Sequence, residues 1–160
     1  MPLSDSISTT LGRQFASFKW ARNNTLQIFK VAQKAKILDF TSNTNQHAVL
    51  YQFQCLVTTD DTYYRKLTND TDTRFGVRIE DESTIKKAEI REGNIVQFLQ
   101  ADLARFESLF VDFTDQQFKD SAQDIQRIFN HEYLHQGQLI VLFRQAGIKL
   151  PERFTKAFDL

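Results

Sequence analysis

The chain has 160 residues, and its 20 basic and 20 acidic residues give a formal net charge of zero at pH 7. This length is sufficient for one domain with a substantial core, so we expect a single domain over residues 1–160. The neutral charge gives no electrostatic signal for binding nucleic acid, and the longest apolar run, Leu139 to Phe143, is far short of the ~20 residues that a membrane span requires.

Helix breakers are scarce, because the chain contains two prolines, Pro2 and Pro151, and five glycines. Most of the sequence is therefore compatible with long helices. Hydrophobic spacing predicts four of them, which run from about Ser6 to Ala35, from Ser42–Thr44 to about Leu67, from Ser83 or Thr84 to about Phe110, and from Asp115 or Gln116 to Ala146, with Gly147 directly after the last.

The segment between the second and third predicted helices, Thr68 to Ser83, is polar and predicts a longer irregular connection. Within it, Phe75 to Ile79 has the pattern of a short extended piece or hairpin. Four long helices with otherwise short connections predict an all-α fold, an antiparallel four-helix bundle. The 15 phenylalanines are expected to fill its core.

Two of the three histidines carry the strongest functional signal. His131 and His135 lie four residues apart in the fourth helix, so their side chains point only about 40° apart, one turn along the helix. They also belong to a seam with alternating steps of three and four residues, from Ile128 to Leu142, which faces the interior of a bundle. Buried imidazoles need bonded nitrogens, and a shared metal ion or hydrogen bonds in the core would satisfy them.

His47 lies at the start of the second predicted helix, where a third imidazole would reach the same interior. An isolated histidine in a first helical turn is more typical of an exposed residue. Three neutral imidazoles suit transition metals better than magnesium or calcium, and three protein ligands leave a position for water or substrate, as in catalytic sites. We therefore expect a metal at His47, His131 and His135, zinc or nickel first, with iron or manganese as alternatives.

The segment from His131 to His135 also matches the H-E-x-x-H pattern of zinc peptidases, in which Glu132 would be the general base. No histidine follows His135, and the sequence predicts little sheet to bind a peptide strand. A peptidase is therefore a minor alternative, and Glu132 is one candidate catalytic residue.

The fourth helix resembles the DinB/YfiT-like superfamily in the run from His131 to Leu139, then in Leu142-Phe143-Arg144 and Gly147-Ile148 before Pro151. The resemblance covers most of the chain, because His47 falls where that family has its first ligand, early in helix two. It implies a DinB-like four-helix bundle in which His47, His131 and His135 hold a divalent ion. It also implies a bacterial protein, frequent homodimers, and chemistry with a low-molecular-weight thiol: S-transfer from bacillithiol or mycothiol, or a related isomerisation.

Two residues near the histidines are candidates for the open side of the metal. Tyr51 lies one turn after His47, and Gln138 lies about one turn after His135. Tyr51 is also a candidate catalytic residue, whereas packing for Tyr51 and hydrogen bonding to a ligand for Gln138 are their alternative roles. Gly137 in mid-helix costs about 1 kcal/mol relative to Ala, which a closely approaching helix would explain.

The single Cys55 excludes an intrachain disulfide, which suits a reducing cytoplasm, and we interpret it as a small core residue. The polar start of the chain lacks the pattern of a signal peptide. We therefore expect a cytoplasmic, metal-dependent enzyme of thiol S-transferase or hydrolase type that acts on a small molecule and binds neither nucleic acid nor membranes. The alternative is a non-enzymatic bundle that binds a ligand or partner.

Overall fold

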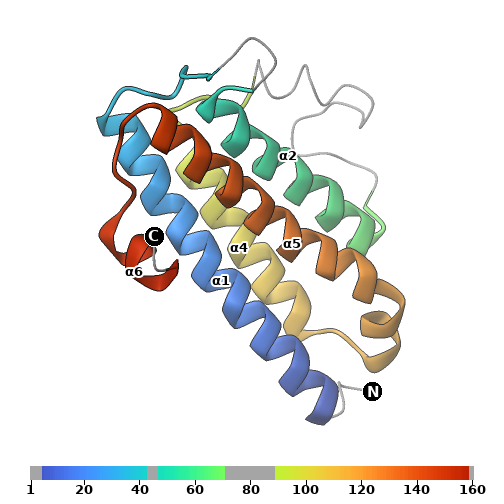
Figure 1. Ribbon diagram of the computed structural model, residues 1–160. Helices are drawn as coiled ribbons and strands as arrows, with labels where there is room; N and C mark the ends of the chain where they lie inside the picture. The colour runs from blue at the N-terminus through green and yellow to red at the C-terminus, as the bar shows by residue number, and fades with distance from the viewer. Residues whose placement is uncertain (1–4, 43–46, 71–88, 159–160) are drawn as a thin grey trace.

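The computed structural model of the chain describes residues 5–42, 47–70 and 89–158. Over these ranges it contains helices and no strand, which confirms the predicted all-α class. None of the helices is both long enough and apolar enough to cross a bilayer. They are α1 (Asp5–Lys34), α2 (Val49–Thr68), α4 (Ile95–Val111), α5 (Asp115–Gln145) and α6 (Glu152–Phe158) (Figure 1).

The long helices lie side by side, and each packs against two others (Figure 1). α5 and α4 each pack against both α1 and α2. α1 and α5 run in one direction and α2 and α4 in the other. The pairs α2/α5 and α1/α4 are therefore antiparallel, as the sequence predicts for neighbours, whereas α1/α5 and α2/α4 are parallel. In the antiparallel α2/α5 pair, α5 carries His131 and His135 and α2 carries Cys55.

The first and last predicted long helices correspond closely to α1 and α5. α5 begins with a capping box, in which the Thr114 hydroxyl accepts from the Gln117 N–H and the Gln117 side chain accepts from the Thr114 N–H. Its end is followed by Gly147 with φ 68°, the left-handed conformation that glycine adopts without strain. Both ends are therefore specified by local chemistry that can be read from the sequence.

α2 begins later than the predicted start at Ser42–Thr44. Ala48 is in an extended conformation, with φ −61° and ψ 162°, so the first helical residue is Val49. His47 consequently precedes the helix instead of lying in its first turn. Residues 43–46 fall outside the described ranges.

α4 begins at Ile95 and not at Ser83 or Thr84, because the residues directly before it form a turn. The Asn94 side chain accepts from the Arg91 N–H and donates to the Glu89 carbonyl, each at 2.8 Å. A side chain that bonds its own neighbouring backbone in this way competes with helix formation. The predicted irregular connection, with its extended piece from Phe75 to Ile79, falls mostly on residues 71–88, outside the described ranges.

α6 is an addition to the predicted helices. It follows Pro151 and returns to the bundle, where Phe154 is only 1% exposed and belongs to the core. α6 thereby contributes Phe154 to the larger of the two hydrophobic clusters of the core.

The core consists of two hydrophobic clusters. The larger includes Phe53 of α2 and Phe143 of α5, and the other includes Phe18 of α1 and Phe129 of α5. A buried polar layer separates the two clusters. Each long helix contributes a buried charged residue to it: Arg22 from α1, Asp60 from α2, Asp102 from α4 and Glu132 from α5. A charged layer in this position is unusual, because burying ionised groups is unfavourable unless each one is paired.

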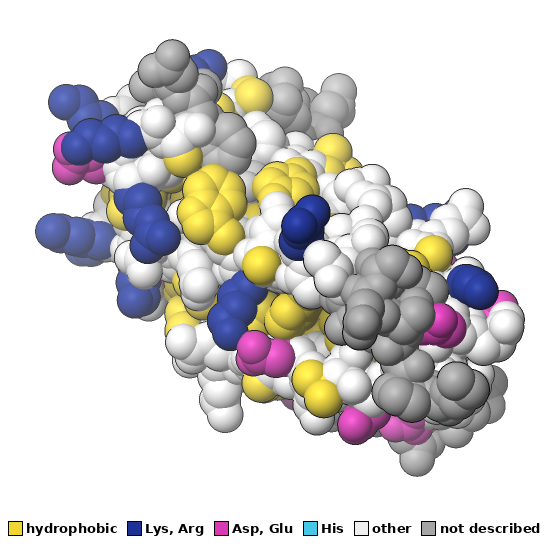
Figure 2. Space-filling model, turned by 90° about the horizontal axis from the view of Figure 1, so that it is seen from below, with side chains coloured by type: hydrophobic (Ala, Val, Ile, Leu, Met, Phe, Trp, Pro, Cys, Tyr) yellow, Lys and Arg dark blue, Asp and Glu magenta, His cyan; other side chains and the backbone are white. Residues whose placement is uncertain are grey.

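Figure 2 shows one face of the molecule, on which hydrophobic side chains are interspersed with Lys, Arg, Asp and Glu. No histidine side chain is visible among the described residues of this face.

Two positions of α5 differ from their predicted surroundings. A Cβ atom added at Gly137 would meet no atom within 4 Å, so no neighbouring helix approaches it closely. Gln138 is exposed, and at this level of the helix Gln136 and Leu139 are buried instead. The interpretation of Gly137 as a contact point is therefore wrong, and Gln138 does not face the interior.

Replacing Gly137 with alanine should stabilise the protein by up to about 1 kcal/mol, because alanine has the higher helix propensity and nothing obstructs its methyl group. The free energy of unfolding in urea measures this change. Gly147→Ala is the matched control and should destabilise the protein, because the position has φ 68°. A destabilising Gly137→Ala variant would contradict the open surroundings of this residue.

Candidate metal centre

The histidine pair of α5 faces α2 as one unit. His131 Nε2 and His135 Nε2 lie 3.0 Å apart, and the two ring planes are inclined by 81°. His135 is buried and His131 is partly buried. The four-residue spacing therefore brings two imidazole nitrogens to one point, as the sequence predicts.

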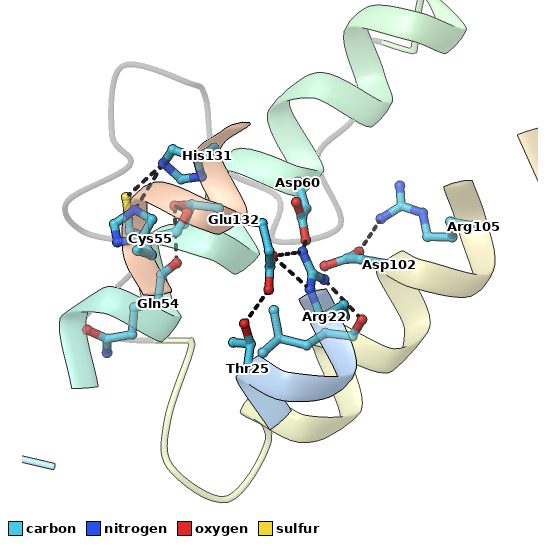
Figure 3. A network of polar contacts seen from close by, with 12 residues as sticks. Arg22, Thr25, Gln54, Cys55, Asp60, Asp102, Arg105, His131 and Glu132 are labelled. Atoms are coloured by element: carbon cyan, nitrogen blue, oxygen red, sulfur yellow. Dashed lines mark hydrogen bonds and ion pairs between the residues drawn. The ribbon is translucent and has the colours of Figure 1, made fainter. Parts of the chain in front are cut away.

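Cys55 of α2 lies at the same point (Figure 3). Its Sγ is 3.8 Å from His131 Nε2, and the ligand atoms of Cys55, His131 and His135 all lie within 4.8 Å of one another. A tetrahedral zinc ion, bonded at about 2.0 Å to nitrogen and 2.3 Å to sulfur, separates two nitrogens by roughly 3.3 Å and nitrogen from sulfur by roughly 3.5 Å. The two separations from His131 Nε2, 3.0 Å to nitrogen and 3.8 Å to sulfur, are close to these values, so small rotations of the side chains would bring the three ligand atoms around one transition-metal ion.

Gln52 fixes the orientation of the His135 ring from α2. Its Oε1 lies 2.7 Å from His135 Nδ1 and accepts the proton of that nitrogen, and its Nε2 donates to the His47 carbonyl at 3.5 Å. With the proton on Nδ1, His135 presents the lone pair of Nε2 toward His131 and Cys55. Metal-binding histidines almost always donate a hydrogen bond from the ring nitrogen that does not bind the metal, as His135 Nδ1 does to Gln52.

His47, the expected third ligand, is not a member of this group. It is exposed, and its ring stacks on Tyr51 with centroids 3.7 Å apart and planes inclined by 17°. The reason is register: His47 precedes α2, whereas the residue of α2 level with His131 is Cys55, eight positions later. The structure thus brings His131 and His135 together with Cys55, which the sequence interpretation assigned to the core, and places the stacked His47 and Tyr51 elsewhere.

Glu132 has a structural environment that does not suit a general base. It is fully buried, and its Oε2 accepts from Arg22 Nε at 2.9 Å and from Arg22 Nη2 at 2.7 Å. The hydroxyl of Thr25 donates to the other carboxylate oxygen. One residue further along a helix points about 100° away, so Glu132 faces α1 while His131 faces α2. The catalytic role considered for Glu132 is therefore not supported, and the H-E-x-x-H match lacks its base.

Arg22 joins four helices in one buried network (Figure 3). Besides Glu132 of α5, its guanidinium contacts Asp60 Oδ2 of α2 at 2.8 Å and donates to the Leu99 carbonyl of α4 at 3.2 Å. Asp102 of α4 lies in the same layer and pairs with Arg105 at 3.3 Å. The layer thus places several acidic groups around one fully buried cation.

Burial raises the pKa of Asp60 and Arg22 lowers it, while the negative charges of Asp102 and Glu132 also raise it; together these effects bring the pKa from 3.8 to about 7. For Arg22, burial alone disfavours the charged form, but the carboxylates of Asp60 and Glu132 hold its pKa above the ordinary value. The cation is therefore permanent, and Asp60 is the member of the network that exchanges a proton near neutrality.

A groove with a volume of about 640 Å³ opens beside the histidine pair, between α2 and α5. His131 belongs both to this groove and to the Cys55–His135 group. The remaining lining residues are Thr59, Thr62 and Tyr63 of α2 and Arg127, Asn130 and Leu134 of α5. The volume is within the range of small-molecule sites, so a small molecule bound here would contact a metal ligand.

The raised pKa of Asp60 predicts a pH dependence of stability. Between pH of about 4 and 7 the folded state keeps a proton that the unfolded state has lost, so the Asp60 contribution to the free energy of unfolding falls as pH rises through this window and is constant above it. Between pH 5 and pH 8 the free energy of unfolding should decrease by on the order of 2 kcal/mol more in wild type than in Asp60→Asn. Urea unfolding at the two pH values measures this difference.

Asp120→Asn is the control for this measurement, because it removes an exposed carboxylate from the same chain. Its pH profile should parallel that of wild type. Equal pH profiles for wild type and Asp60→Asn would contradict the assignment of the buried proton to Asp60.

Comparisons of the chain with models of protein families, with curated proteins and with solved structures find no match. Any function proposed for the chain therefore rests on its own residues and geometry.

Proposed function

We propose that the chain binds one divalent transition-metal ion through His131, His135 and Cys55 and acts as a metal-dependent enzyme on a small molecule. The observation that carries this proposal is the convergence of two imidazole nitrogens and one sulfur within 4.8 Å of one another. The hydrogen bond from His135 Nδ1 to Gln52 supports it, because it directs the opposite nitrogen toward the other ligands.

The donor set favours a thiophilic metal. Two imidazoles and a thiolate suit zinc, and also nickel or iron, better than manganese. Three protein ligands leave a position for an exogenous group. When bound, such an ion lowers the pKa of a coordinated water or thiol toward neutrality and so supplies a nucleophile for hydrolysis or S-transfer. The groove beside His131 provides the space for the small electrophile.

We further propose that α1, α2, α4 and α5 form a four-helix bundle of the DinB-like kind. The pairwise packing of these helices and the motif from His131 to Leu139 support this assignment. The ligand set proposed here departs from the family pattern at one position, with Cys55 in place of His47. A low-molecular-weight thiol as cosubstrate and a homodimer in the bacterial cytoplasm remain predictions from the resemblance.

A non-enzymatic bundle is the second candidate, and one observation favours it. The 3.0 Å between His131 Nε2 and His135 Nε2 is also an ordinary hydrogen-bond distance, with His131 as donor and His135 as acceptor. In this case the two facing Nε2 atoms bond each other without metal, and a chelator leaves the melting temperature unchanged.

Metal binding is tested on protein purified without a histidine tag. We expect about one transition-metal ion per chain by elemental analysis. The ion should be lost in His131→Ala, because this variant removes one of the three proposed ligands. The cobalt-substituted protein should show a thiolate-to-metal charge-transfer band that disappears in Cys55→Ser and persists in His47→Ala.

The same variants separate the alternatives. Absence of the band in the cobalt-loaded wild type, or loss of metal in His47→Ala while Cys55→Ser keeps it, would replace the proposed ligand set with the three histidines. Metal-free wild-type protein that takes up no ion on dialysis would favour the hydrogen-bonded core. Circular dichroism of each variant shows whether it remains folded.

Gln52→Leu should lower metal affinity by about 10- to 100-fold, because the His135 ring loses the acceptor that orients it. Competition with a metal-binding dye measures the affinity. Gln54→Leu is the matched control. It makes the same change two residues further along α2, at a side chain that donates to the Ile90 carbonyl. Equal losses of affinity in the two variants would show that Gln52 acts only through the stability of α2.

A further inference from the structure

The groove beside the proposed metal centre has a defined direction. Cys55 lies one turn before Thr59 on α2, and His131 lies one turn after Arg127 on α5. Because α2 and α5 are antiparallel (Figure 1), Thr59 and Arg127 lie on the same side of the proposed centre, about one helical turn from it. The two levels, at His131 and at Arg127, are separated by four residues, about 6 Å along the helix axis. A small molecule can therefore touch both.

A cationic side chain, Arg127, lines the far end of the groove. Asp124 Oδ1 lies 3.3 Å from Arg127 Nη1, and Asp124 Oδ2 lies 2.8 Å from Lys66 Nζ. One carboxylate thus faces two cations and leaves one positive charge in excess. No carboxylate occurs among the described residues that line the groove, where Arg127 stands with neutral hydroxyl and amide groups.

The chemistry of this lining favours a small organic anion. A guanidinium presents its donors as a planar fork that matches a carboxylate or a phosphate. A single Arg among the described lining residues favours the carboxylate, which has the smaller charge, whereas phosphate sites usually combine several donors. Thr59, Tyr63 and Asn130 offer hydrogen-bonding groups along the wall, and Leu134 offers an apolar surface. The groove thus matches a short chain that is polar at one end and charged at the other.

We propose that this groove binds a small carboxylate-bearing substrate, with the carboxylate on Arg127 and the opposite, reacting end against His131. The second half of this assignment rests on the proposed metal-dependent function. The first half, a carboxylate subsite at Arg127, does not require a metal. Arg127 is then the residue that selects acidic substrates over neutral analogues of the same length.

The metal-loaded protein is tested with 3-mercaptopropionate, which carries a metal-binding thiol and a carboxylate, and with the neutral analogue 3-mercaptopropanol. Calorimetry of wild type should give about tenfold tighter binding of the acid. In Arg127→Gln the preference should fall to about one, with metal content unchanged. Lys119→Gln is the control, because it removes an exposed positive charge from α5 that does not line the groove and should keep the preference.

Equal binding of acid and alcohol by wild type, or an unchanged preference in Arg127→Gln, would overturn the proposal. If the chain takes up no metal, the proposed function fails and the subsite is decided separately. Glutarate titrated into metal-free protein should then shift the amide resonances of α2 and α5 around the groove, in wild type and not in Arg127→Gln. Absence of these shifts, or displacement of glutarate by an equal concentration of inorganic phosphate, would overturn the carboxylate subsite.

Discussion

The contact between Arg22 and its carboxylate partners is the constraint on which the arrangement of the helices depends. One guanidinium on α1 meets Glu132 of α5, Asp60 of α2 and the Leu99 carbonyl of α4. A buried ion pair adds little to stability by itself, but removal of one partner leaves an uncompensated charge and is strongly destabilising. Hydrophobic faces alone allow helices to slide by a turn, whereas these pairings are satisfied in one register only. The layer thus fixes how four helices align.

The geometry of the candidate site depends on this alignment of the helices. Glu132 and His131 are consecutive residues of α5, so the pairing of Glu132 with α1 determines that His131 is directed to α2. Gln136 repeats the pattern: it donates to the Ala21 carbonyl of α1, while the preceding His135 bonds Gln52 of α2. Structural residues and candidate ligands alternate along one stretch of α5. The charged layer and the candidate metal centre therefore lie on two faces of the same segment of α5.

This alternation explains which features of the fold and of the candidate site could be predicted from the sequence. The extents of α1 and α5 follow from spacing and caps, and the convergence of His131 and His135 follows from helix geometry alone. The register of α2 against α5 does not, because it depends on Arg22 and its partners, and no local pattern shows that an arginine is fully buried. Without that register, the sequence indicated His47 as the third ligand and Cys55 as a core residue. The prediction that Gln138 faces inward rested on the seam with steps of three and four residues, whereas it is Gln136 that lies buried.

The identity of the third ligand also changes what the centre can do. A divalent ion bound by two neutral imidazoles and one thiolate has a net charge of about +1, whereas three imidazoles leave +2. The lower charge weakens the attraction of the metal for an anionic substrate. An anionic group must then be bound by some other cation, and the groove provides one, Arg127, one helical turn from His131. The proposed cysteine ligand and the proposed carboxylate subsite are therefore complementary: under the two proposals the centre at His131 would take the reacting end of the substrate, and Arg127 would hold the other end.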